Sequence, residues 1–138
     1  MLKGKYYHNM DAKGRVFIPA KFRSIIGETF VVTYGLDNCL WAYSTEDWAE
    51  KAKQLSALPM KARNMQQFFF SNADDAVVDK QGRILLSADL RKHALLEKET
   101  AILGVGSRME IWNADRQRER FAGISMEQVE AMMEEMNF

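Results

Sequence analysis

Two short segments of the chain place an arginine directly after a glycine. Asp11–Ile18 (DAKGRVFI) recurs further along as Asp79–Leu86 (DKQGRILL). An arginine held on a rigid turn can bind a phosphate, or O6 and N7 of guanine, through two hydrogen bonds. The same arginine could instead pair with the aspartate four residues earlier and only stiffen the turn, and both roles can coexist. The duplicated segment therefore indicates nucleic-acid binding, with a structural ion pair as the alternative.

A tight turn is the local structure that this segment predicts. The aspartate carboxylate can accept hydrogen bonds from backbone N–H groups that follow it, and the glycine permits a positive φ. The apolar β-prone residues after the arginine predict a buried strand. Each turn thus presents its arginine at the start of a strand. The predicted turn residues are Asp11, Gly14, Asp79 and Gly82.

The repeat continues beyond the turns and shows that a module of about forty residues is duplicated. Residues 30–41 align with residues 101–112, so that each copy ends in a tryptophan. Before these strands, Pro19 predicts the start of a short helix over residues 20–26 that Gly27 closes. Ser87 is the expected N-cap of the equivalent helix in the second copy.

Helices are predicted between the modules and at the C-terminus. Ser44 and Asp47 resemble a capping box that opens a helix, and Pro59 interrupts it before a second helix. Ser125 is predicted to cap a C-terminal helix with an apolar stripe opposite its glutamates. We expect this stripe to pack on the core of its own chain, with a neighbouring chain as the alternative. The stripe consists of Met126, Val129, Met133 and Met136.

Composition and charge are those of one compact unit with two differently charged ends. The 138 residues are 47% hydrophobic, which excludes a wholly disordered chain. Net charge is zero, but residues 1–23 hold six basic and one acidic residue, and residues 109–138 hold three basic and seven acidic. Such a distribution can direct one basic surface towards DNA. Without an apolar stretch of membrane-spanning length or a signal peptide, we expect a cytoplasmic protein.

Signals for catalysis, metals and cofactors are weak. His8 and His93 are isolated, and Cys39 is the only cysteine, which we interpret as a small buried apolar residue. The glycines of residues 104–106 lack the third glycine of a dinucleotide fingerprint and predict a hairpin turn instead. The acids of residues 74–79 resemble a magnesium cluster, but Asp79 is already explained as a turn residue. We therefore expect no catalytic residue, metal, cofactor or small-molecule substrate.

The turn segments carry a family resemblance. The D-x-x-G-R phrase followed by P-A-x-F-R at residues 19–23 is similar to the AbrB family of swapped-hairpin, DNA-binding transition-state regulators. Two such modules in one chain resemble the MraZ family of bacterial regulators, which is associated with the division and cell-wall gene cluster. Residues 4–8, 68–71 and 104–112 also lie in that family's order.

The resemblance implies an α+β fold. Two tandem AbrB-like swapped-hairpin modules would form a small β-barrel with a pseudo-two-fold axis, and the protomers would assemble into a closed homo-oligomeric ring. The implied organisation is a first module at 4–47, a helical connector at 48–75, a second module at 76–119 and a C-terminal helix at 120–138.

The resemblance also implies a function and a site. The expected function is sequence-specific binding of double-stranded DNA at short direct repeats in a promoter, as a repressor associated with the nucleoid. Arg23 and Arg91, on the short helices, either orient the turns or add phosphate contacts. Lys13 and Lys80 are not equivalent, because Gln81 occupies the slot of Lys13. The expected DNA-binding residues are Lys13, Arg15, Lys80, Arg83, Arg23 and Arg91.

Two alternatives stay open at this point. An AbrB-like antitoxin or other protein-interaction module would use its tail to bind a partner protein, although the tail here is predicted to be a capped helix. An enzyme on a double-psi barrel, a related architecture, is disfavoured because the chain lacks a recognisable nucleophile, metal-ligand or cofactor motif.

Overall fold

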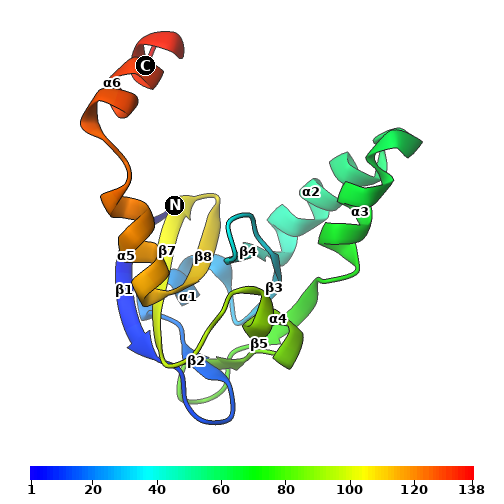
Figure 1. The fold of residues 1–138 in the computed structure, drawn as a ribbon. Helices are drawn as coiled ribbons and strands as arrows, with labels where there is room; N and C mark the ends of the chain where they lie inside the picture. The colour runs from blue at the N-terminus through cyan, green and yellow to red at the C-terminus, as the bar shows by residue number, and fades with distance from the viewer.

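A computed structural model describes residues 1–138 (Figure 1). Helices and strands are both abundant, which confirms the α+β prediction. The first copy contains β1 (Leu2–Asn9), β2 (Arg15–Phe17), α1 (Ala20–Ile26), β3 (Thr29–Tyr34) and β4 (Leu40–Ser44). The connector contains α2 (Thr45–Ser56), a short 3-10 helix η1 (Met60–Ala62) and α3 (Arg63–Phe70). The second copy contains β5 (Asp74–Val77), β6 (Arg83–Leu85), α4 (Ala88–His93), β7 (Glu99–Gly106), β8 (Arg108–Asn113) and α5 (Ala114–Ala122), and α6 (Met126–Glu135) follows.

Both sheets are built from strands of both copies. The main sheet has the order β1-β7-β8-β4-β3-β5, and β2 pairs with β6 in a second, two-stranded sheet. The first strand of each copy pairs with the third strand of the other, β1 with β7 and β5 with β3, in antiparallel ladders. Equivalent strands meet in the β2–β6 and β4–β8 ladders. Neither copy can therefore complete its sheet without the other.

The small β-barrel that the family resemblance implied is not closed by these ladders. The six-stranded sheet is open, with β1 and β5 at its edges, and β2 and β6 pair only with each other. Strands β2 and β6 are short, with three residues each. Val16 and Ile84, at the centre of these strands, are fully buried. The small sheet thus covers the core through side-chain packing rather than through hydrogen bonds that close a barrel.

One hydrophobic core receives equivalent residues from both copies. Val16, Ile18 and Phe22 of the first copy pack in the same buried cluster as Ile84 and Leu90 of the second. Full burial of a side chain of this size contributes about 1.5–3 kcal/mol. The residues that follow each turn are therefore anchored strongly, and the turns themselves are held at the surface above this core.

Predicted helix starts agree with the structure. Pro19 precedes α1 and Gly27 follows it with φ 98°. The Ser87 hydroxyl accepts from Leu90 N at 3.2 Å, and the Ser44 hydroxyl accepts from Asp47 N at 3.1 Å. Ser125 and its partner three residues on form a complete capping box. These starts depend on local side chains, which is why the sequence predicts them.

Helix α5 was not predicted. A single helix was expected in residues 120–138, whereas α5 already begins at Ala114. Its N-cap is Asn113, whose amide oxygen accepts from Asp115 N at 3.0 Å and from Arg116 N at 3.2 Å. Since α5 follows β8 as directly as α2 follows β4, it is the second copy's counterpart of α2. The asparagine followed by an acidic first turn was the available signal.

Two helical segments project from the sheet (Figure 1). The α2–α3 pair extends on one side, and α6 stands apart on the other after the short link 123–125. No residue of α6 is buried, so the expectation that its stripe packs on its own core is wrong. Its N-terminus is closed by the capping box of Ser125 and Gln128. None of the helices combines the length and the apolar character that crossing a membrane requires.

Candidate nucleic-acid interface

The two glycine turns are held next to each other by the β2–β6 ladder, in which Arg15 is opposite Leu85 and Phe17 is opposite Arg83. Two further backbone bonds cross between the copies. Ile18 N donates to Gly82 O at 2.8 Å, and Leu86 N donates to Gly14 O at 3.0 Å. Each glycine carbonyl is thus bound by the strand of the other copy, which fixes one turn relative to the other at one end of the molecule.

Within each turn the aspartate organises the backbone as predicted. Oδ1 of Asp11 accepts from Lys13 N at 3.0 Å and from Arg15 N at 2.9 Å. Oδ1 of Asp79 accepts from the backbone of the two equivalent positions, each at 2.9 Å. These backbone donors are the main reason that the pKa of both carboxyl groups lies below the usual value of 3.8. Both aspartates are therefore ionised, and Oδ1 of each accepts the backbone hydrogen bonds of its turn.

The second carboxylate oxygen orients the arginine. Arg15 Nε lies 2.6 Å from Asp11 Oδ2, and Arg83 Nε lies 3.0 Å from Asp79 Oδ2. Arg83 also reaches Asp11 across the copies, with Nη1 at 3.6 Å from Oδ2. Because Nε makes the close contact, the two terminal nitrogens of Arg15 have no protein acceptor. The guanidinium is oriented by its inner edge while its outer edge is available to a ligand.

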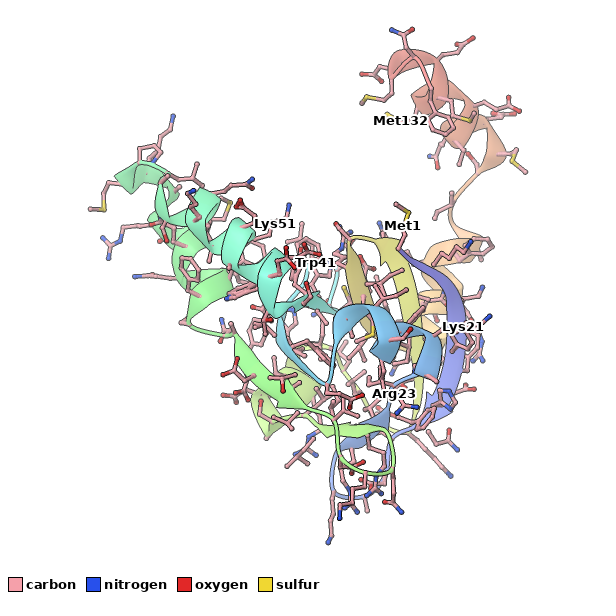
Figure 2. The ribbon with its side chains drawn as sticks, turned by 180° about the vertical axis from the view of Figure 1, so that it is seen from behind. Met1, Lys21, Arg23, Trp41, Lys51 and Met132 are labelled. Atoms are coloured by element: carbon pink, nitrogen blue, oxygen red, sulfur yellow. The ribbon has the colours of Figure 1, made fainter.

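Arg23, which is labelled in Figure 2, and Arg91 each lie against the turn glycine of the opposite copy. A Cβ on Gly82 would meet Arg23 Cζ at 3.1 Å, and a Cβ on Gly14 would meet Arg91 Cζ at 2.8 Å. Arg23 Nε donates to the carbonyl of Ile18 at 3.0 Å, and its guanidinium lies 5.6 Å from the Phe17 ring centre. The structure thus gives both arginines a supporting position, and a DNA contact from them stays a prediction.

Lys13 and Lys80 are exposed on the tips of the two turns. Neither makes an ion pair, whereas Arg15 and Arg83 are both paired with Asp11. The register difference noted in the sequence persists, because Gln81 occupies the Lys13 slot and donates its backbone N–H to the turn aspartate. The outward charge of each turn therefore comes from an exposed lysine without an ion pair, beside an arginine that is paired with aspartate.

The cysteine and the two histidines, which the sequence raised as candidates for thiol or metal chemistry, pack against other side chains or in the interior. Cys39 is fully buried, and burial raises the pKa of its thiol to about 12, so the thiol is neutral. His93 stacks on Tyr34 with ring centres 3.9 Å apart. His8 lies edge-on to Phe17 at 4.8 Å. No group of three or more His, Cys, Asp or Glu side chains is placed to hold a metal ion.

The contacts that join the copies were not predicted from the sequence. Each arginine was expected to pair with the aspartate of its own turn, but Asp11 also faces Arg83, and Phe17 packs beside Gly82 with Cε2 2.9 Å from the position of an added Cβ. These contacts depend on the register between β2 and β6. A repeat read one copy at a time contains no signal for them.

Comparisons with known proteins identify the family of the chain. A family model described as "MraZ protein, putative antitoxin-like" matches twice, over residues 1–68 and 69–136. A "Transcriptional regulator MraZ" from Thermoanaerobacter sp. is 45% identical over 142 aligned positions that cover 99% of each chain. Proteins with the same name from Heliobacterium modesticaldum and Alkaliphilus oremlandii are 51% and 53% identical over 84% and 82% of this chain, which is 83% and 81% of theirs. With both repeats matched and relatives this similar along most of its length, the chain belongs to the MraZ family.

Proposed function

We propose that this protein is a DNA-binding transcriptional regulator that represses a promoter through its paired glycine turns. The observation that carries the proposal is the joint placement of Arg15 and Arg83 at one end of the molecule, each held through Nε. The outer nitrogens of such an arginine can donate hydrogen bonds to a phosphate or to the O6 and N7 atoms of guanine. Lys13 and Lys80 add charge at the turn tips, where they suit sequence-independent phosphate contacts.

The exchanged strands support reading both turns as one binding unit. Since β1 pairs with β7 and β5 pairs with β3, the two copies resemble a swapped-hairpin dimer joined into a single chain. Equivalent strands meet in the β2–β6 ladder, which supports an approximate two-fold axis between the turns. A pair of turns made in this way would contact one short DNA box.

We further propose that several protomers act together in a closed homo-oligomer. The basic surface of one protomer is small, so a single box should bind weakly, and useful affinity should come from several boxes engaged at once. A rigid assembly approaching from one side requires boxes about one helical turn apart, roughly 10 base pairs. The proposed operator is therefore a set of short direct repeats, G-rich where arginines contact guanine.

Capture of genomic fragments by the purified protein, followed by sequencing, tests this proposal without assuming a target. We expect enrichment of promoter fragments with short repeats. Inserting about five base pairs between two repeats should remove most of the added affinity, and inserting about ten should restore part of it, because only the second keeps the same groove facing the protein. Equal binding to every fragment, or indifference to both insertions, would contradict the proposal.

An antitoxin-like or other protein-binding role is the second candidate. The family description names an antitoxin-like character, and α6 is a capped, fully exposed helix suited to contacting another protein. A partner protein that raises the melting temperature, in the absence of any DNA shift, would favour this role. We propose no enzymatic activity, and we place the protein in the cytoplasm at the nucleoid, where its DNA partner lies.

A further inference from the structure

An apolar groove lies between the α2–α3 pair and the sheet, far from the turns. It has a volume of about 340 Å³ and an aromatic lining from β4, α2 and α3. The rings of Trp41 and Phe69 stack with centres 5.7 Å apart, and Tyr43 lies 6.2 Å from Trp48. Leu58 and Met65, at the outer part of the groove, are substantially exposed. The groove is an open aromatic surface with nothing of its own chain covering it.

Helix α6 presents an exposed apolar ridge, whereas the groove is an apolar hollow. Its exposed stripe is rich in methionine, an unbranched side chain that adapts to irregular surfaces and makes favourable sulfur contacts with aromatic rings. Spacing of three and four residues places Met126, Val129 and Met133 along one side of the helix. An apolar ridge without a partner and an apolar groove without a filler thus occur in one protomer.

The groove and α6 also carry opposite charges, which favours this pair of surfaces over non-specific apolar contact. Residues 51–63, which form the outer half of the α2–α3 pair, hold four basic residues and no acidic one. Residues 126–138 hold four glutamates and no basic residue. Lys51 belongs to the groove lining itself. A helix with an acidic flank would be attracted to this groove and repelled by acidic surfaces.

The two surfaces lie on different sides of the protomer. Figures 1 and 2, which view the molecule from opposite directions, both show α6 and the α2–α3 pair apart. Residues 123–125 are the only link between α5 and α6, and three extended residues span at most about 11 Å. If the ridge of one copy binds the groove of the next, the contact is head-to-tail. Repeating such a contact gives a ring when the successive rotations add up to a full turn.

We infer that the methionine stripe of α6 docks into the aromatic groove of a second copy of this chain. The inference rests on the proposed homo-oligomer and gives it a specific contact. It also separates the molecule into two independent surfaces, turns for DNA and α6 with its groove for assembly. Variants on α6 should therefore change the size of the assembly without changing how one protomer reads one box.

A matched pair of substitutions tests the contact. Met133→Asp places a charge in the stripe, and Ala131→Asp places the same charge on the glutamate side of the same helix. The mass of the full-length protein, measured by light scattering over a dilution series, should fall towards the protomer's 15.9 kDa for Met133→Asp only. Since α6 has no buried residue, neither variant should unfold the core, and circular dichroism verifies this.

Tryptophan emission provides a second measurement at the groove. Trp41 and Trp48 line the groove, whereas Trp112 is only 4% exposed in the core. We expect wild-type emission to shift to longer wavelength on dilution, and Met133→Asp to show the shifted emission at every concentration. Both α6 variants should bind a DNA fragment with a single box as wild type does.

The outcomes distinguish this contact from the wider proposal. A wild-type assembly that Met133→Asp leaves intact would overturn the α6 contact and leave the homo-oligomer standing. A wild-type protein that stays a protomer at all concentrations would overturn both, and DNA binding by that protomer would still support the regulator. A third outcome is a difference in tryptophan emission between wild type and Met133→Asp that stays the same at every protein concentration. It would show that α6 folds onto the groove of its own chain, which also overturns docking between copies.

Discussion

The two glycine turns share a backbone but differ at the point where they meet. In both, the aspartate accepts backbone bonds through Oδ1 and binds its own arginine through Oδ2. Asp11, however, faces both Arg15 and Arg83, whereas Asp79 faces Arg83 alone. A duplicated module can therefore keep its turn geometry while one copy becomes the electrostatic centre of the pair.

Their packing differs in the same place. Phe17, after the first turn, is half-buried against His8 and lies beside Gly82 of the second turn. Its counterpart Leu85 is 64% exposed, and the three atoms nearest to a Cβ on Gly14 all belong to the outer part of the Arg91 side chain. The second turn thus rests against a fixed ring and the first against a mobile side chain. Substitutions at equivalent positions should consequently have unequal effects.

Removing the arginines should have the largest effect, on DNA affinity. A forked arginine–guanine contact contributes about 1–3 kcal/mol, roughly a tenfold to hundredfold change in affinity. We expect Arg83→Ala to weaken binding more than Arg15→Ala, because Asp79 then loses its only arginine while Asp11 keeps one in either variant. Fluorescence anisotropy with a single-box duplex measures this.

Arg118→Ala is the control for these variants. Arg118 also forms an ion pair, with Glu99 at 2.8 Å, but on α5 rather than on a turn. It should bind DNA as wild type does. Wild-type affinity in the folded Arg15→Ala, Arg83→Ala double variant would remove the turns from recognition.

Alanine at the turn glycines should have the next largest effect, on stability. Gly14 and Gly82 have φ of 87° and 81°, and a left-handed conformation costs an alanine about 1–2 kcal/mol. Gly82→Ala should cost more, because its Cβ would lie 2.9 Å from Phe17 Cε2, an atom of a packed ring. Urea unfolding should thus rank wild type above Gly14→Ala and Gly14→Ala above Gly82→Ala.

Gly123→Ala tests whether conformation causes that loss. Gly123 has φ −81°, and an added Cβ there would have no neighbour closer than 3.5 Å. This variant should be neutral or slightly more stable than wild type, since alanine restricts the unfolded chain. Equal unfolding free energies for Gly14→Ala and Gly82→Ala would show that the Phe17 contact has no energetic consequence.

Local residues predicted the turns well, and long-range pairing escaped prediction. An aspartate, a glycine and an arginine at fixed spacing determine the turn through bonds within five residues, and Ser87 determines a helix start through one bond. The exchange of strands between copies, by contrast, pairs residues such as Leu2 and Gly106. Hydrophobic patterns identify a buried strand without identifying its neighbour, so the swapped hairpins and the small barrel were expected only from the family resemblance, and the ladders form an open sheet.

The candidate site divides in the same way. Positions 15 and 83 and their aspartate partners follow from a single copy of the motif. The placement of Arg23 and Arg91 over the opposite glycines requires the fold, because each contact joins an α-helix of one copy to a turn of the other. The fate of α6 could not be read from its stripe either, since an apolar face indicates a contact but not its partner.

Neutralising the turn aspartates should have a smaller, pH-dependent effect. Backbone and arginine contacts lower the pKa of both carboxyl groups below 3.8, so each ionised group stabilises the fold above that value. Asp11→Asn and Asp79→Asn should lower the melting temperature at about pH 7, Asp11→Asn more because two arginines face it. The deficit should shrink as the pH falls through the lowered pKa, where wild type loses the same charge. A deficit of constant size across this range would assign the loss to geometry instead of charge.

The smallest effect should come from the lysines, which occupy different slots in the two turns. A lysine that neutralises one phosphate changes the slope of log affinity against log salt by about 0.9. Lys13→Gln and Lys80→Gln should each reduce the slope by about that amount, weakening all DNA sequences alike, while Lys3→Gln should not, since Lys3 lies near the far end of β1 from the turns. Moving the second lysine into the Lys13 slot, with Lys80→Gln and Gln81→Lys together, should restore the slope, because a lysine is a flexible point charge that can reach a phosphate from either position. A double variant that behaves like Lys80→Gln alone would show that the offset is used, and that the two turns contact the two halves of a box in different ways.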